Sequence, residues 1–137
     1  MPILNLNNDT APVLREWTQS DKLVVACLCA AWCDVCRDYR AVLEAVAQRH
    51  PDSYFVWIDI EDCADLVGDF DVDNFPTLLI QRGAHIAFFG SVPPGLALAD
   101  RLVQSQADKS LADLIDETNA SVERQRWRDT LHLRHRL

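Results

Sequence analysis

The chain has 137 residues, of which 49% are hydrophobic and 25% are charged, and its formal net charge is −8. That length is typical of one domain, and a folded chain of this size buries roughly two-thirds of its unfolded surface, enough for a core without disulfides. The acidic balance argues against nucleic-acid binding, which needs a basic face. The longest apolar run, residues 23–33, is shorter than the ~20 residues that cross a bilayer, so no membrane contact is expected.

The cysteines and the beginning of the chain predict a reducing compartment. Residues 1–5 lack the basic start and apolar stretch of a secretory signal. Five cysteines cannot all pair within one chain, and their spacing follows no disulfide framework. Reduced thiols in the cytoplasm are therefore expected. The charge is uneven, with a net of −12 over residues 1–123 and +4 over residues 124–137, so an acidic body carries a basic tail.

The first half of the chain alternates between strand-like and helix-like segments. Residues 23–30 form a continuous apolar run with two valines, which is typical of a strand buried on both faces. From Val35 the apolar residues recur at helical spacing, and Pro51 ends that stretch. The expected elements are a strand at 3–6, a helix at 12–19, a strand at 23–30, a helix from 35, and a strand at 54–60.

The second half adds a hairpin and more helices. A short helix is expected over 62–68, strands over 77–81 and 85–91 with a turn at Arg82-Gly83, and a helix that ends near Ala107. Buried strands that alternate with helices, followed by a hairpin, predict an α/β fold. Its mixed central sheet should be flanked by helices on both faces, with one extra C-terminal helix.

That last helix should open at Ser110, which begins a capping-box pattern. It carries one apolar stripe, which an isolated short helix cannot leave in water. We expect order through about Val122, mobility beyond about Leu131, and pairing of the basic end with the acidic stretch 59–73, either in the same chain or in a neighbouring one. Whether the helix folds back or forms a homodimer stays open. The stripe consists of Leu111, Leu114, Ile115, Thr118 and Val122.

Chemistry concentrates at Trp32-Cys33-Asp34-Val35-Cys36, where the buried strand gives way to a helix. Cys33 falls at the helix N-terminus, where unpaired N–H groups and the helix dipole stabilise a thiolate. Cys36 lies one turn further on the same face, close enough to resolve a mixed disulfide. The alternatives are that the two cysteines are half of a zinc site or that they are buried and inert. A structural zinc site needs four ligands, and the sequence offers no second pair to complete one. We expect no metal and no bound cofactor.

These residues resemble the thioredoxin family. The resemblance covers residues 1–107 as a thioredoxin-like domain and leaves 108–137 as a helical extension with a basic tail. It implies that Cys33 and Cys36 are catalytic and that Trp32, Phe75 and Pro76 bind the substrate, with a cis peptide bond before Pro76. The matching residues are Ala30-Ala31-Trp32-Cys33, Cys36, Phe75-Pro76-Thr77, Arg82-Gly83 and Gly90.

Some positions depart from the family pattern. Asp34 places a negative charge beside Cys33, which should raise the pKa of that thiol. Cys27 stands where the family usually buries an Asp beneath the dithiol, and Trp57 stands near the place of the partner Lys. Asp34 and Cys27 should therefore modulate the exchange, above an apolar pocket. Core packing is the expected role of Cys27 and Cys29, which point to the same side of one strand.

Two features further along the chain each have a purely structural and a functional interpretation. Cys63 is expected to be a surface thiol, with a regulatory role as the lesser option, because its acidic neighbours disfavour a thiolate. The stretch from Asp59 to Asp73 holds seven acidic residues and no basic one. It is either a solvated face or a surface that steers basic partners to the groove.

The function expected from the sequence is thiol–disulfide exchange. The chain would reduce protein disulfides through Cys33 and Cys36 and would draw its electrons from a reductase donor. The alternative is a thioredoxin-like module that binds one partner and has weak or no general reductase activity. The loss of the buried Asp and Lys and the added helix favour the second hypothesis, whereas the intact Cys-x-x-Cys and Phe-Pro-Thr motifs favour the first.

Overall fold

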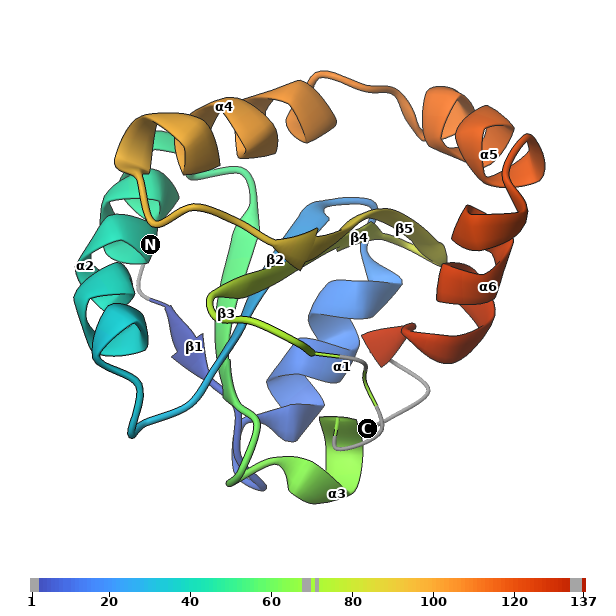
Figure 1. Cartoon of the computed structure of the whole chain (residues 1–137). Coiled ribbons are helices and arrows are strands. Elements are labelled where there is room, and N and C mark those ends of the chain that lie inside the picture. Colours follow the sequence, from blue (N-terminus) through green and yellow to red (C-terminus); the bar gives the residue numbers. More distant parts are fainter. Residues whose placement is uncertain (1–2, 68–69, 71, 134–136) are drawn as a thin grey trace.

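The computed structural model describes residues 3–67, 70, 72–133 and 137. One five-stranded sheet runs through it in the order β1-β3-β2-β4-β5 (Figure 1). The first three of these strands are parallel, β4 runs antiparallel to β2, and β5 completes a hairpin with β4. The expected mixed sheet is therefore confirmed. Its strands are β1 (Leu4–Asn5), β2 (Leu23–Cys29), β3 (Tyr54–Asp59), β4 (Thr77–Arg82) and β5 (His85–Ser91).

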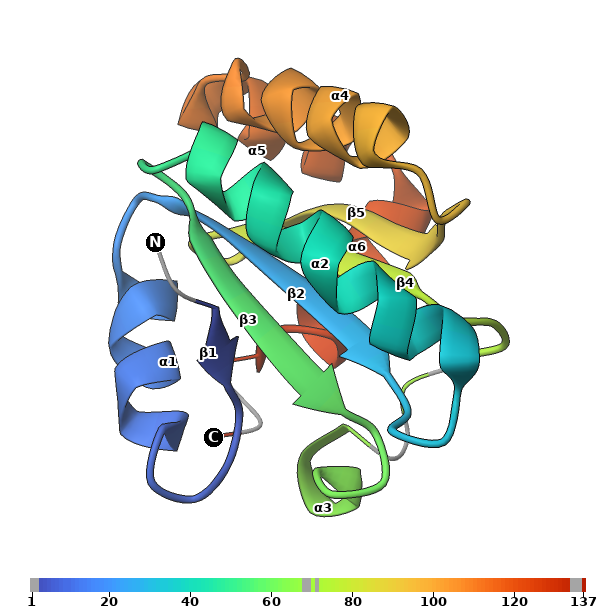
Figure 2. The same cartoon turned by 90° about the vertical axis from the view of Figure 1, so that its left-hand side faces the viewer.

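Strand β2 lies at the centre of the sheet and is buried along its whole length, as its apolar run predicts. Because side chains alternate along a strand, Val25, Cys27 and Cys29 pack on one face, and Val24, Ala26 and Leu28 pack on the other. Helices α2 (Asp34–Arg49) and α4 (Leu96–Ala107) cover the first face, and α1 (Ala11–Gln19) and α3 (Ala64–Val67) cover the second (Figure 2).

The segment after α4 forms two helices instead of the single helix expected. Helix α5 (Leu111–Asn119) begins at the predicted capping box of Ser110 and Asp113. Ser121 then adopts an extended conformation, and its side chain accepts a hydrogen bond from the Arg124 N–H at 3.2 Å, which starts α6 (Val122–Thr130). The break removes Val122 from the apolar stripe, so this residue is 72% exposed.

The extension passes around β5 from one face of the sheet to the other (Figure 1). Leu114 of α5 belongs to the core on the α2 side, whereas Leu131 and Leu133 belong to the core on the α1 side. The Leu133 N–H also donates to the buried Oε1 of Gln81 at 3.1 Å. The predicted mobility beyond Leu131 is therefore wrong for residues 132–133, since burial holds them. Residues 134–136 lie outside the described residues.

Among the described residues, Arg124 and Arg128 of α6 make their ion pairs outside the acidic stretch 59–73. Arg124 lies 3.6 Å from Glu117 and donates to the carbonyl of Ala87 at 2.9 Å, and Arg128 pairs with Asp129. Both arginines thus find partners in the extension itself or on β5, which the helix break brings close. Within the described part of the chain, no helix is both long enough and apolar enough to cross a membrane.

Candidate active site

The loop between β2 and α2 presents Cys33 at the start of a helix. Its backbone is extended, with φ −87° and ψ 119°, and it is the N-cap of α2 without a side-chain capping bond. The Cys33 N–H donates to the Ala30 carbonyl at 3.0 Å, and the Cys33 carbonyl accepts from Arg37 at 3.1 Å. The sulfur is free and half-buried. Cys33 therefore presents its sulfur at the N-terminal end of α2.

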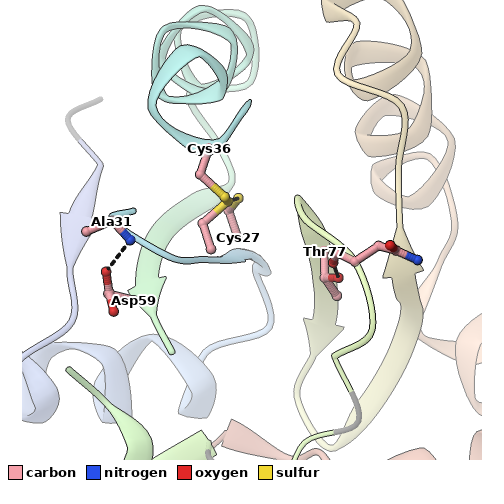
Figure 3. The surroundings of a disulfide bond; sticks show 7 residues. Cys27, Ala31, Cys36, Asp59 and Thr77 are labelled. Atoms are coloured by element: carbon pink, nitrogen blue, oxygen red, sulfur yellow. Dashed lines mark hydrogen bonds between the residues drawn. A yellow bond between two sulfur atoms is a disulfide. The ribbon is translucent and has the colours of Figure 1, made fainter. Parts of the chain in front are cut away.

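Cys36 is buried and forms a disulfide with Cys29, the last residue of β2 (Figure 3). The two Cα atoms are 5.7 Å apart, and both residues are at most 1% exposed. The sequence predicts Cys33 as the thiol that exchanges with Cys36, and this structure bonds Cys36 to a different cysteine. Cys29 is buried as its core-packing interpretation requires, but its sulfur is also bonded, which that interpretation missed.

Cys27 lies beside this disulfide on the same face of β2 (Figure 3). Its Sγ is 3.8 Å from the Sγ of Cys29. Burial raises the pKa of the Cys27 thiol well above its usual range, and the charge of Arg40 opposes the shift only weakly. The pocket that was expected to be apolar also has a cation at its edge, because the Arg40 guanidinium lies 5.2 Å from the centre of the Trp57 ring.

Two acidic residues at and after the end of β3 hold the loop before Cys33 in place. Asp59, at the end of β3, accepts a hydrogen bond from the Ala31 N–H at 2.9 Å (Figure 3) and two more from the N–H groups of Glu61 and Asp62. Glu61 accepts from the Trp32 indole N–H at 2.6 Å. Part of the acidic stretch therefore fastens the loop before Cys33. The position of Asp59 at the end of β3, which is the neighbour of β2, is the sequence signal that could have indicated this.

The second predicted motif lies against the first. The peptide bond between Phe75 and Pro76 is cis, as the resemblance implied. The Phe75 ring meets the Trp32 ring edge to face, with centroids 5.7 Å apart and an interplanar angle of 79°. Phe75 and Cys33 also pack against the same core cluster, and Trp32 is 62% exposed. An exposed aromatic surface thus borders the half-buried thiol.

The other predicted features of the site have different outcomes. The exposed Asp34 carboxylate pairs with Arg37 one turn along the helix. Cys63 is buried, not on the surface, and its thiol donates to the Leu6 carbonyl at 3.4 Å because α3 folds it under β1.

A cavity of about 470 Å³ next to Cys36 is lined by residues that include Arg37, Arg40, Trp57 and Asp59. Over the described residues, no cluster of three or more His, Cys, Asp or Glu could hold a metal ion.

Comparison with known proteins identifies the family. A family model described as Thioredoxin matches residues 8–102 of this chain, which is more than half of its length. The chain belongs to the thioredoxin family. The matched segment includes β2, the loop with Cys33, and the cis peptide bond before Pro76. The extension, residues 108–137, lies outside it.

The relatives and solved structures extend this comparison. Thioredoxin H2 of Arabidopsis thaliana is 35% identical over 73 residues, which are 53% of this chain and 55% of that protein. Thioredoxin-2 of Saccharomyces cerevisiae is 32% identical over 63 residues, 46% of this chain and 61% of that one. The chain thus spans a little more than half the length of these curated relatives. The structure of thioredoxin h PtTrxh4 from poplar matches with a TM-score of 0.69 and 16% identity, over 79% of this chain and 98% of that one, which shows a shared fold.

Proposed function

We propose that this thioredoxin-family chain is a thiol–disulfide oxidoreductase that reduces protein disulfides through Cys33 and Cys36. The observation that carries the proposal is the placement of a free, half-buried Cys33 at the N-cap of α2, with the resolving position Cys36 one turn deeper. Trp32, Phe75 and Pro76 would form the border against which an extended substrate lies. Family membership supports oxidoreductase chemistry at a general level.

The proposed reaction starts from the protein in which Cys36 is a free thiol. The Cys33 thiolate attacks one sulfur of a substrate disulfide, and the other substrate sulfur leaves as a thiolate. The Cys36 thiolate then attacks the Cys33 sulfur, so that a Cys33–Cys36 disulfide forms and the second substrate thiolate leaves. Two electrons pass from the dithiol to the substrate. A reductase donor would return them, and the expected cytoplasmic setting would supply such a donor.

Two neighbouring groups would tune this reaction. The Asp34 carboxylate lies beside the nucleophile, and its ion pair with Arg37 offsets part of its charge. Cys27 would leave the dithiol without a buried carboxylate to accept protons, because burial keeps its own thiol protonated. Both features favour a slower and more specialised oxidoreductase.

Reduction of insulin by the protein in the presence of dithiothreitol tests the proposal. The wild-type chain should accelerate the precipitation of insulin, and Cys33→Ser should lower the rate to that of dithiothreitol alone. Cys63→Ser is the matched control, because Cys63 is also free but lies in the other core, and its rate should equal that of the wild type. Equal rates for wild type and Cys33→Ser would reject the proposed chemistry.

A partner-binding module is the second candidate. The observation behind it is the bond between Cys29 and Cys36, which leaves Cys33 without its resolving partner in this form of the protein. Such a module would capture partners on the Trp32 and Phe75 surface without turning over disulfides. Cys36→Ser, which should hold a mixed disulfide on Cys33, separates the two: an oxidoreductase yields covalent complexes that dithiothreitol releases, whereas a module binds equally well with Cys33→Ser.

A further inference from the structure

The disulfide in the structure joins Cys36 of the Cys-x-x-Cys motif to Cys29, which lies outside that motif. Cys29 ends β2 and Cys36 lies in the first turn of α2, so the loop between them folds the helix back over the end of its own strand. Cys33 caps the same helix, one turn before Cys36. Cys36 is therefore bonded to the buried Cys29 and lies one helical turn from the half-buried thiol of Cys33.

We propose that Cys29 is a third redox-active thiol, and that Cys36 exchanges its disulfide partner between Cys33 and Cys29. This inference rests on the proposed function, since it begins with the Cys33–Cys36 disulfide that substrate reduction leaves behind. The oxidised protein then rests with a buried Cys29–Cys36 disulfide and a free Cys33, which is the arrangement in the structure.

The exchange step needs no external oxidant or reductant. The Cys29 thiolate attacks the Cys36 sulfur, the Cys29–Cys36 bond forms, and the Cys33–Cys36 bond breaks. Cys33 leaves as a thiolate and takes up the proton that Cys29 gave up, so the number of disulfides and thiols stays the same. The step is an isomerisation.

The surroundings of the two end cysteines determine its direction. Cys29 is fully buried and its sulfur touches that of Cys27, so a thiolate there is poorly solvated. Cys33 is half-buried at the N-terminus of α2, where a released sulfur is in contact with solvent. Before the exchange the unbonded sulfur is the buried one of Cys29, and after it the unbonded sulfur is the half-buried one of Cys33. The second arrangement solvates the free sulfur better, so the Cys29–Cys36 form is favoured.

The resting form has a consequence for the electron donor. Both sulfurs of its disulfide belong to residues that are at most 1% exposed, so an external thiol does not reach them directly. Cys33 must first attack Cys36 and re-form the exposed disulfide. Cys33 is therefore the entry point for reductant as well as for substrate.

Differential alkylation of the full chain tests the pairing directly. The reduced protein is oxidised with one equivalent of diamide and quenched with acid, and its free thiols are blocked with N-ethylmaleimide in denaturant. Reduction and labelling with iodoacetamide then mark the cysteines that were bonded. Trypsin cleavage after Lys22 and Arg37 places Cys27, Cys29, Cys33 and Cys36 in one peptide, in which tandem mass spectrometry assigns each label.

The expected result is iodoacetamide label on Cys29 and Cys36, and maleimide on Cys33 and Cys27. Label on Cys33 and Cys36 with maleimide on Cys29 would overturn the inference. If that pattern accompanies normal insulin reduction, the proposed function stands and only the role of Cys29 fails. Absence of both insulin reduction and a bond to Cys36 would defeat the proposed function as well.

Variants give a second readout. Oxidised wild type and the control Cys63→Ser should each retain a Cys33 that reacts with iodoacetamide under native conditions. Oxidised Cys29→Ser, or Cys29→Ala if the serine variant does not fold, should lose that reactivity because Cys33 is trapped in its bond to Cys36. A Cys33 that stays equally reactive in the oxidised Cys29 variant would contradict the isomerisation.

Discussion

The cysteines of the active-site loop come together from positions close in sequence, whereas the C-terminal extension is held by contacts with distant parts of the chain. The cysteines that meet at the site come from a short segment, residues 27–36, in which a strand, a loop and a helix follow one another directly. The extension is held by Leu114 on one face of the sheet and Leu133 on the other, with Gln81 of β4 as a distant partner. A local motif can thus identify the reactive groups, whereas an apolar stripe does not say where its helix will pack.

This comparison predicts that the extension controls stability and leaves the chemistry of the loop alone. Leu133→Ala should lower the free energy of unfolding by about 2–4 kcal/mol, because truncation of a fully buried leucine leaves a cavity. Val122→Ala, at a residue 72% exposed in the same extension, should change it by less than about 0.5 kcal/mol. Urea unfolding measures both. Insulin reduction per folded molecule should stay unchanged, and a loss of rate in a folded Leu133→Ala protein would break the separation.

A smaller effect is expected where a distant residue does support the loop. Asp59→Ala removes the acceptor of three backbone hydrogen bonds, including that from Ala31. The cost should be on the order of 1–3 kcal/mol, together with slower disulfide exchange, because the loop before Cys33 loses its anchor. Asp62→Ala is the matched control, since that carboxylate is exposed and adjacent. Equal unfolding curves and exchange rates for the two variants would show that Asp59 does not position the loop.

The smallest effect concerns the seam between β5 and the extension, where His85 lies 2.9 Å from the Thr118 hydroxyl. Burial, reinforced by the charge of Arg128, lowers the pKa of His85. The unfolded chain then binds more protons than the folded one, so this contribution to stability is present above the unfolded pKa of about 6.5 and is lost as the pH falls. The melting temperature should fall further between pH 7.5 and 5.5 in the wild type than in His85→Gln. Equal falls would mean that His85 titrates alike in both states.

Much of the fold could be predicted because it depends on the periodic spacing of apolar residues within single strands and helices. The apolar run of residues 23–30 indicated a strand buried on both faces, and β2 is such a strand. Helical spacing from Val35 located α2, and the residues around Arg82-Gly83 located the hairpin, where Gly83 has a φ of +58° that favours glycine. The break at Ser121 was missed because a single N-cap inside a polar segment has little effect on an apolar pattern.

The sequence by itself located the candidate Cys-x-x-Cys motif at a strand-to-helix turn, and its resemblance to a known family implied that Phe75-Pro76 lies opposite that motif. Its alternation also placed Cys27 and Cys29 on one face of the strand. Only the tertiary structure decided that Cys36 bonds Cys29, that Asp59 and Glu61 hold the loop, and that residues 131–133 are buried. The reason is physical: periodicity fixes direction along one element, whereas a bond between elements depends on how closely their packing brings them together.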